Sequence, residues 1–298
     1  MVQMTVGDMA LKVALLLQVG AGVLGNAYLL FLHGSLCSSG HRQKTADLVL
    51  SNLAMANSFV LLSKGTQQIM EDLGLTSVLE GSGCQVFYYL HRVSREVLLC
   101  VTCLLSCFQS VVVSPRSGLW LVLRHKISKH AGSSCFLCWT PNLAINIISP
   151  IQIRVAWENS SDFVTRNSIV CQLQATKSGM YSIPLSFMGA LLMTLMVVAS
   201  VHMVCVLLRH HQKVQHIHSP SVAHRTSPEV WATYSSLLLV ASFIPFYFLN
   251  SIYVFYDTKS FSSYLWLQHT LKFLATCFPT LSPLALVLKN SRALGSCF

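Results

Sequence analysis

The sequence has little charge for its length. Asp, Glu, Lys and Arg make up 10% of its 298 residues, whereas a soluble domain carries roughly 25%. Hydrophobic residues account for 53% of the chain, and the mean hydropathy is +0.57. This deficit argues against a soluble domain and indicates a membrane protein. The formal net charge of +10 is spread between apolar blocks and forms no stripe, so we expect no nucleic-acid partner.

Signatures of catalysis and of metal binding are also missing. No G-x-S-x-G, H-E-x-x-H or G-x-x-x-x-G-K-[ST] motif occurs, so we expect no enzymatic activity and no cofactor. Cys135 and Cys138 have the spacing of a zinc or redox half-site. No second pair accompanies them, and they begin an apolar run in which cysteine behaves as a small hydrophobic residue. The first apolar run lacks a basic n-region and a small-residue cleavage site, so it is read as a retained span rather than a signal peptide.

What the chain does have is long apolar runs. A helix needs about 20 mostly apolar residues to cross a bilayer, and seven segments qualify. The sequence therefore predicts an all-α membrane protein, with a seven-transmembrane helix bundle that forms a single domain over residues 1–298. The predicted spans are residues 9–32, 48–69, 86–113, 134–153, 180–208, 230–255 and 264–288.

The orientation of the bundle follows from the lysines and arginines of its loops. Eleven of them lie on the side of the C-terminal tail and six on the other side. Because loops rich in Lys and Arg stay in the cytoplasm, we expect the N-terminus outside and the C-terminus inside. The predicted protein is a multi-pass protein of the plasma membrane, in contact with membrane lipid.

Two features of the predicted outer side agree with this orientation. The sequon Asn159-Ser160-Ser161 falls in the second outer loop, where Asn159 could carry a glycan. Cys84 and Cys171 are both assigned outside, where disulfides persist. A bridge between them would hold the second outer loop over the bundle; the alternative is two free thiols.

Charged residues inside a span are costly and tend to be functional. His91, Arg92, Arg95 and Glu96 follow Cys84 by about two to three helical turns. The i,i+4 spacing puts Arg92 and Glu96 on one face, so an internal ion pair between them would leave Arg95 available for an acidic ligand. Lys272 in the seventh span is a second candidate. The competing interpretation is that these groups reach the outer surface and pair for structural reasons.

The stretch from Arg209 to Ser219 carries four of the twelve histidines. A metal site is one interpretation, but no two of these histidines are four residues apart. His216 and His218 could chelate only in an extended chain, so we expect no metal. A basic inner loop that contacts lipid headgroups and a partner protein is the preferred interpretation.

Several motifs resemble the rhodopsin-like G-protein-coupled receptors, and one branch in particular. Gly25-Asn26 and LSNLAMAN at residues 50–57 resemble their first two helices. Phe108-Gln109-Ser110 stands where most of them have Asp-Arg-Tyr, and Ser282-Pro283 where they have Asn-Pro. With those replacements, the blocks YLHRVSR, LCWTPNLAINI, RHHQKVQHIHS and FPTLSPLALV are similar to the vomeronasal type-1 receptor family, from the first span to the C-terminus.

The resemblance implies a pheromone-type receptor. It would bind a small volatile or steroid-like molecule within the bundle and activate a heterotrimeric G protein of the inhibitory type. Glu96 departs from a glycine that is common in the family, and a carboxylate there would neutralise part of the arginine face. A non-signalling relative and a small membrane carrier remain the alternatives. The residues expected in the G-protein coupling region are Gln109, Arg116, Arg209, Lys213, His216 and His218.

Overall fold

The computed structural model describes most, but not all, of the chain. The described residues are 6–38, 45–72, 82–115, 118–147, 153–157, 169–173, 175–217, 234, 237–249 and 273–286.

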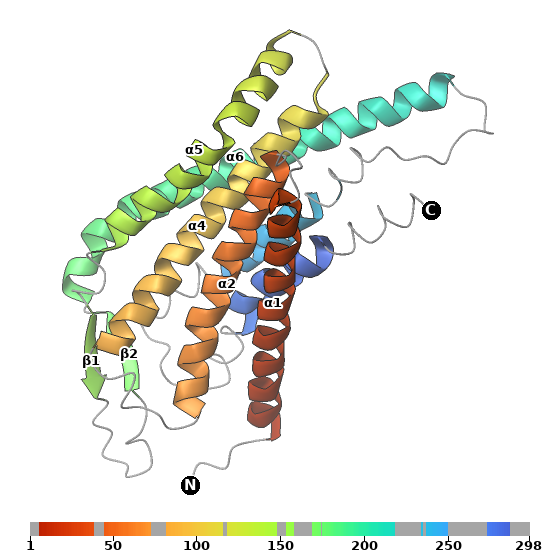
Figure 1. The fold of residues 1–298 in the computed structure, drawn as a ribbon. Helices are drawn as coiled ribbons and strands as arrows, with labels where there is room; N and C mark the ends of the chain where they lie inside the picture. Colours follow the sequence, from red (N-terminus) through yellow and green to blue (C-terminus); the bar gives the residue numbers. More distant parts are fainter. Residues whose placement is uncertain are drawn as a thin grey trace.

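Five long helices and a short hairpin make up the first part of the chain (Figure 1). The helices are α1 (Val6–Ser38), α2 (Thr45–Asp72), α4 (Ser82–Val113), α5 (Leu119–Asn146) and α6 (Ala175–Ile217), and the strands are β1 (Ile153–Trp157) and β2 (Ile169–Leu173). Two shorter apolar helices follow. We name them after the predicted spans within which they fall: the sixth-span helix (Leu237–Leu249) and the seventh-span helix (Phe273–Leu286).

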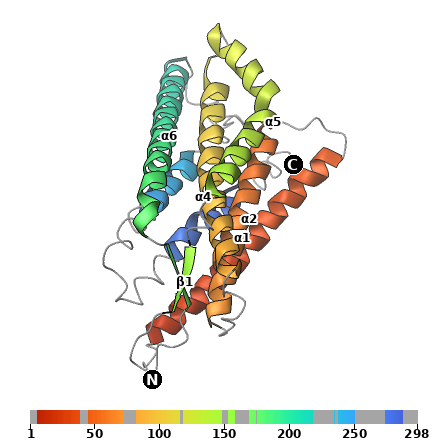
Figure 2. The same ribbon diagram turned by 90° about the vertical axis from the view of Figure 1, so that its left-hand side faces the viewer.

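Helix α4 is the centre of the bundle. It packs against α2, α5 and α6, while α1 packs against the far side of α2, as the two ribbon views show (Figures 1 and 2). The run from Val97 to Leu105 supplies much of the contact surface, and Val97, Leu99 and Val101 have no exposed surface. Apolar residues all round this part of α4 are what a helix surrounded by other helices requires.

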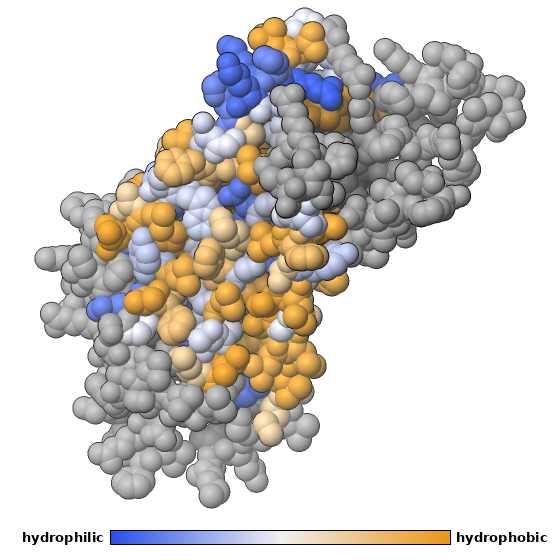
Figure 3. All heavy atoms as spheres, in the orientation of Figure 1, coloured by the Kyte–Doolittle hydropathy of each residue, from blue (hydrophilic) through white to orange (hydrophobic). Residues whose placement is uncertain are grey.

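The outside of the bundle is apolar as well. Leu17, Leu24 and Phe31 of α1 lie seven residues apart, on one helix face, and each is at least 70% exposed. Figure 3 shows apolar side chains covering the flank of the molecule, with hydrophilic ones gathered at its upper end. An exposed apolar surface of this extent indicates contact with lipid.

Four of the described helices are long and apolar enough to cross a membrane. The qualifying segments are Lys12–Ser35, Thr45–Gln67, Gln85–Val113 and Phe187–Arg209, which overlap the predicted spans one, two, three and five. The helical membrane fold is thus confirmed in its coarse form. The orientation stays a prediction, and "outer" and "inner" denote the ends predicted to face outside and inside.

The fourth span differs from its predicted bounds. Helix α5 begins at Leu119, fifteen residues before the predicted start, and ends at Asn146 rather than at residue 153. Gly118 has a φ of 56°, a conformation that glycine adopts readily. The chain turns at this residue, directly before α5 begins. A hydropathy run stops at the first charges, but Arg and Lys are good helix formers, so the helix extends beyond the apolar run.

The second outer loop contains structure that an all-α prediction missed. Strands β1 and β2 pair antiparallel, with Ile153 opposite Leu173 and Trp157 opposite Ile169. Both segments are rich in β-branched residues, which favour strands. This signal is present in the sequence, but the predicted fourth span extended to Ile153, the first residue of β1, and no strand was predicted after it.

Candidate functional site: a charged cluster on the outer half of α4

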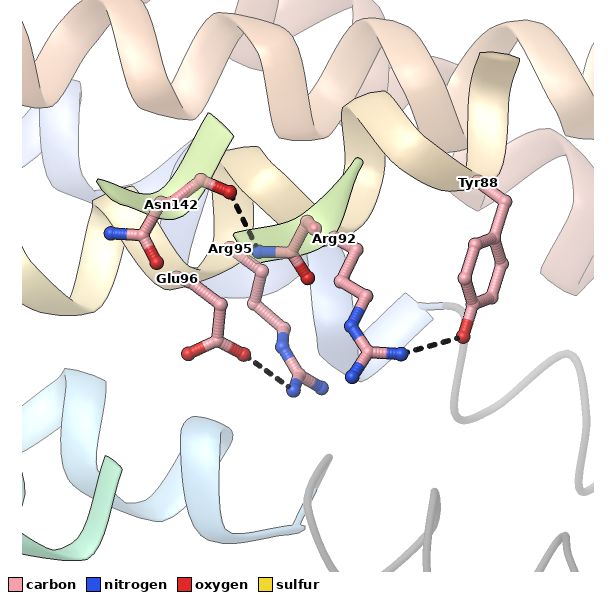
Figure 4. A network of polar contacts seen from close by, with 6 residues as sticks. Tyr88, Arg92, Arg95, Glu96 and Asn142 are labelled. Carbon is pink, nitrogen blue, oxygen red and sulfur yellow. Dashed lines mark hydrogen bonds and ion pairs between the residues drawn. The ribbon is translucent and has the colours of Figure 1, made fainter. Parts of the chain in front are cut away.

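Charged and aromatic side chains gather on the outer half of α4. Figure 4 shows Tyr88, Arg92, Arg95 and Glu96 projecting from the same side of this helix. Their spacing of three to four residues produces this shared face. The apolar run that follows, from Val97, keeps the charges out of the lower half of α4.

An ion pair with an aromatic neighbour forms the inner part of this cluster. Arg95 Nη2 donates to Glu96 Oε1 at 2.9 Å, and the Glu96 side chain is only 9% exposed. The Arg95 guanidinium also lies 5.7 Å from the ring centroid of Tyr247 in the sixth-span helix. A short charge-assisted bond and a cation–π contact hold this arginine in place. The pair therefore connects α4 to the sixth-span helix.

The expected pairing of Arg92 with Glu96 is wrong. Arg92 Nη1 instead donates to the Tyr88 hydroxyl at 3.3 Å, one turn toward the outer end. The i,i+4 spacing allowed the Arg92–Glu96 pair, but Tyr247 offers Arg95 a second contact beside Glu96. The roles of the two arginines are thus reversed: Arg95 is neutralised, and Arg92 is held by an uncharged partner.

His91 completes the cluster, one helical turn before Arg95 on the same face. Its Nδ1 atom is buried and has no hydrogen-bond partner among the described residues. Arg95 Nε, one helical turn away, is also buried, and no described residue bonds to it. Buried polar atoms of this kind cost free energy unless they find a partner, so these two atoms are points where a ligand group could bond.

The other predicted outer residues lie outside the described part of the chain or at positions of which only the backbone is described. Lys272 and Asn159 lie outside the described residues. Cys84 lies on α4 and Cys171 on β2, but their side chains are not among those described. The backbones of α4 and β2 are in contact, so the two elements that carry these cysteines do meet. The disulfide itself stays a prediction.

Aromatic rings continue from this cluster toward the middle of the bundle. Tyr247 stacks on Phe243, which lies one turn earlier in the sixth-span helix, and their ring centroids are 5.5 Å apart. Phe243 meets Phe278 of the seventh-span helix edge to face at 4.7 Å. Both phenylalanines are at most 3% exposed. Arg95 is therefore linked through three rings to the seventh-span helix.

A neutral hydrogen-bond network lies beyond those rings, where α1, α2 and the seventh-span helix meet. Asn57 Nδ2 donates to Asn26 Oδ1 at 3.2 Å and to Ser282 Oγ at 2.7 Å. Asn26 Nδ2 donates to the carbonyl of Pro279 at 2.9 Å. In an unbroken helix that carbonyl would receive the N–H of residue 283, but Pro283 has none. Asn26 thus supplies the hydrogen bond that Pro283 removes.

At the inner end, one of the residues expected in the coupling region is buried. Gln109 of α4 is 5% exposed, so it does not offer a surface to a partner in this conformation. The contact between helices at this level comes from its neighbour: Ser110 Oγ lies 2.8 Å from His202 Nδ1 in α6. The His202 ring also stacks on Trp120 of α5 at 5.2 Å. One histidine thereby joins α4, α5 and α6.

The remaining coupling-region residues lie on or near an extended α6. This helix continues to Ile217, nine residues past the predicted end of the span. It therefore includes Arg209, which is exposed, and the backbone of Lys213 and His216. Arg116 and His218 lie outside the described residues. Among the described residues there is no group of three side chains that could bind a metal ion.

Three residues important to these contacts were not singled out from the sequence: Tyr88, Tyr247 and His202. Tyr88 precedes Arg92 by four residues, so its spacing could have revealed it. Tyr247 and His202 act across helices, and no local pattern indicates which distant side chain each of them meets. The contacts of Tyr247 and His202 become visible only in the packed bundle.

Comparison with known proteins identifies the family. The sequence profile of the vomeronasal organ pheromone receptor family matches residues 9–298. The chain belongs to this family of receptors. It is 36% identical over 290 residues to human vomeronasal type-1 receptor 4, an alignment that covers 95% of each chain. It is 32% identical to human vomeronasal type-1 receptor 1 over 99% of this chain and 84% of that one, and 30% identical to mouse vomeronasal type-1 receptor 40 over 85% and 82%.

Membership confirms the resemblance drawn from the motifs. The chain is a membrane protein of a pheromone-receptor family. The family implies a receptor rather than an enzyme. It also implies, in general terms, a small-molecule ligand and coupling to a G protein.

Proposed function

We propose that this vomeronasal-type receptor binds a small molecule at the charged cluster on α4 and then activates a heterotrimeric G protein of the inhibitory type. The ligand-contacting residues are His91, Arg92, Arg95 and Glu96, together with Lys272. The observation that supports this most is the pair Arg95–Glu96 beside Tyr247. It connects the cluster on α4 to the sixth-span helix, so a change at the cluster would be felt by a second helix.

The proposed activation is a shift between two packings of the helices. A ligand can change this equilibrium only by the difference in its affinity for the two packings. A ligand group that bonds to His91 Nδ1 or Arg95 Nε would alter the position of Arg95 over Tyr247. Tyr247 contacts Phe243, and Phe243 contacts Phe278, so the shift would reach the seventh-span helix through packed side chains.

The coupling surface of the proposal is the inner end. Movement of α6 would break the contact of His202 with Ser110 and expose the region of Gln109. Arg116, Arg209, Lys213, His216 and His218 would then contact the G protein. On the outer side, the proposal includes a Cys84–Cys171 disulfide and a glycan on Asn159.

The test is G-protein activation in cells that express the receptor. The cells would be exposed to a panel of small volatile and steroid-like compounds, with surface expression measured in parallel. We expect activation by at least one compound. We expect Tyr247→Leu to raise the half-maximal concentration at least tenfold, since it removes the ring beside Arg95. Tyr247→Phe keeps the cation–π contact and should stay within about threefold of the unmodified receptor.

The alternatives give different results in the same cells. A receptor at the surface that activates no G protein with any compound would be a non-signalling relative. Uptake of a compound without G-protein activation would indicate a carrier. An equal loss of sensitivity in Tyr247→Leu and Tyr247→Phe would refute the assigned role of the ring.

A further inference from the structure

The inner end of α5 carries a basic stripe that neither the ligand site nor the family assignment explains. This stripe consists of His125, Lys126, Lys129 and His130, and all four side chains are exposed. Positions 125, 126, 129 and 130 share one face because residues three and four apart are neighbours on a helix. Helix α5 contains no Asp or Glu, so no charge of its own neutralises the stripe.

The opposite face of α5 is anchored to the bundle, which fixes the direction of the stripe. Trp120 stacks on His202 of α6, and the Ser128 and Thr45 hydroxyl oxygens are 2.9 Å apart. Ala131 and Cys135 are 5% and 4% exposed. With these residues turned inward, the stripe must point away from the bundle.

The stripe continues into an apolar surface on the same helix. Phe136 and Leu137 are each 66% exposed, and they follow Lys129 and His130 by seven residues, which is about 10 Å along a helix. Seven residues are close to two turns, so both pairs occupy one face. Figure 3 shows the same order at large scale, with hydrophilic side chains at the upper end and apolar ones below.

This order of charge and apolar surface fits a lipid molecule. Helix α5 has 28 residues, or about 42 Å, whereas the hydrocarbon core is about 30 Å thick. Its inner end therefore reaches the headgroup layer. On the predicted orientation this is the cytoplasmic leaflet, whose anionic lipids attract clusters of Lys and Arg.

We infer that the basic stripe of α5 binds the headgroup of an anionic phospholipid whose acyl chains lie along Phe136 and Leu137. Lys126 and Lys129 carry the fixed charges of this site. The nearby carboxylate of Asp47 lies 3.6 Å from His33 of α1, so it faces a partner on the other side of α2.

The test uses the purified full-length receptor in nanodiscs. A fluorescent phosphatidylserine is titrated into a neutral phosphatidylcholine bilayer, and energy transfer to a dye on the receptor C-terminus reports its enrichment around the protein. The unmodified receptor should enrich phosphatidylserine over a fluorescent phosphatidylcholine. The double variant Lys126→Gln/Lys129→Gln should weaken this enrichment by roughly 30-fold, which corresponds to about 1 kcal/mol for each lysine. Lys126→Arg/Lys129→Arg should retain it within about twofold.

A charge-matched control keeps the result specific. Lys44→Gln/Lys289→Gln removes two positive charges from the same predicted side and should leave the enrichment unchanged. An equal loss in this control would overturn the inference, because any inner lysine would then serve. Unchanged enrichment in Lys126→Gln/Lys129→Gln would overturn it too. If that variant instead loses only G-protein activation, the stripe is a protein contact and the lipid site is refuted.

Discussion

The charged cluster on the outer half of α4 and the neutral network around Asn57 both join helices that are distant in the sequence, but with different chemistry. The outer cluster uses two arginines and a glutamate, and the Arg95 side chain keeps 22% of its surface exposed. The deep network uses amides and a hydroxyl, and Asn26, Asn57 and Ser282 are at most 1% exposed. The charged groups of the outer cluster keep part of their surface exposed, whereas the neutral groups of the deep network are enclosed by the bundle.

The two regions also differ in which hydrogen-bonding atoms are satisfied. In the deep network, the side-chain amides of Asn26 and Asn57 each donate to two acceptors. Its one buried atom without a partner among the described residues is an acceptor, Asn57 Oδ1. In the outer cluster, neither the donor Arg95 Nε nor His91 Nδ1 has a hydrogen-bond partner within the described part of the chain. The deep network should therefore determine stability, and the outer cluster should determine response.

The largest expected effect is the loss of Asn26. Asn26→Leu would leave the Pro279 carbonyl without a donor in an apolar environment, at a cost of about 1–3 kcal/mol, and would also remove the bond from Asn57. We expect the free energy of unfolding to fall by about 3 kcal/mol, seen as a lower midpoint in thermal unfolding of the purified receptor. Ser58→Ala is the control, since Ser58 donates to the carbonyl of Ala54 in its own helix. A similar loss in both variants would mean that the network has no special role.

The second effect concerns the close approach of α1 to its neighbours in the same region. A Cβ atom on Gly22 would lie 2.7 Å from both Leu61 Cδ1 and Thr280 Oγ1, whereas one on Gly20 would meet nothing within 4 Å. Gly22→Ala should therefore destabilise the receptor by about 2 kcal/mol through overpacking. Gly20→Ala should be neutral or slightly stabilising, because alanine favours the helix. Equal melting temperatures for the two variants would contradict the close contact.

Much of this architecture could be predicted from the sequence, and the reason is physical. The apolar runs and the position of the charged cluster after Cys84 are local features of the sequence, and a bilayer requires long apolar runs of any helix that crosses it. The partners of Arg95 were not predictable. The i,i+4 rule pairs Glu96 with Arg92, and it does not concern contacts between helices such as that of Arg95 with Tyr247. The length of α5 was missed for a related reason. Hydropathy identifies only the apolar residues that lie in the membrane core, whereas a helix can continue through charged residues beyond that core.

The smallest expected effect tests which of the two arginines, Arg92 or Arg95, is coupled to Glu96. A double-mutant cycle of Arg95→Gln with Glu96→Gln should give a coupling energy of about 1 kcal/mol, which is modest because Arg95 is partly exposed to solvent. The same cycle of Arg92→Gln with Glu96→Gln should give less than about 0.3 kcal/mol, since Arg92 bonds to Tyr88 instead. Thermal unfolding of the unmodified receptor, the three single variants and the two double variants measures both couplings. A larger coupling for Arg92 would restore the pairing predicted from helix spacing and leave Arg95 as the free cation of the cluster.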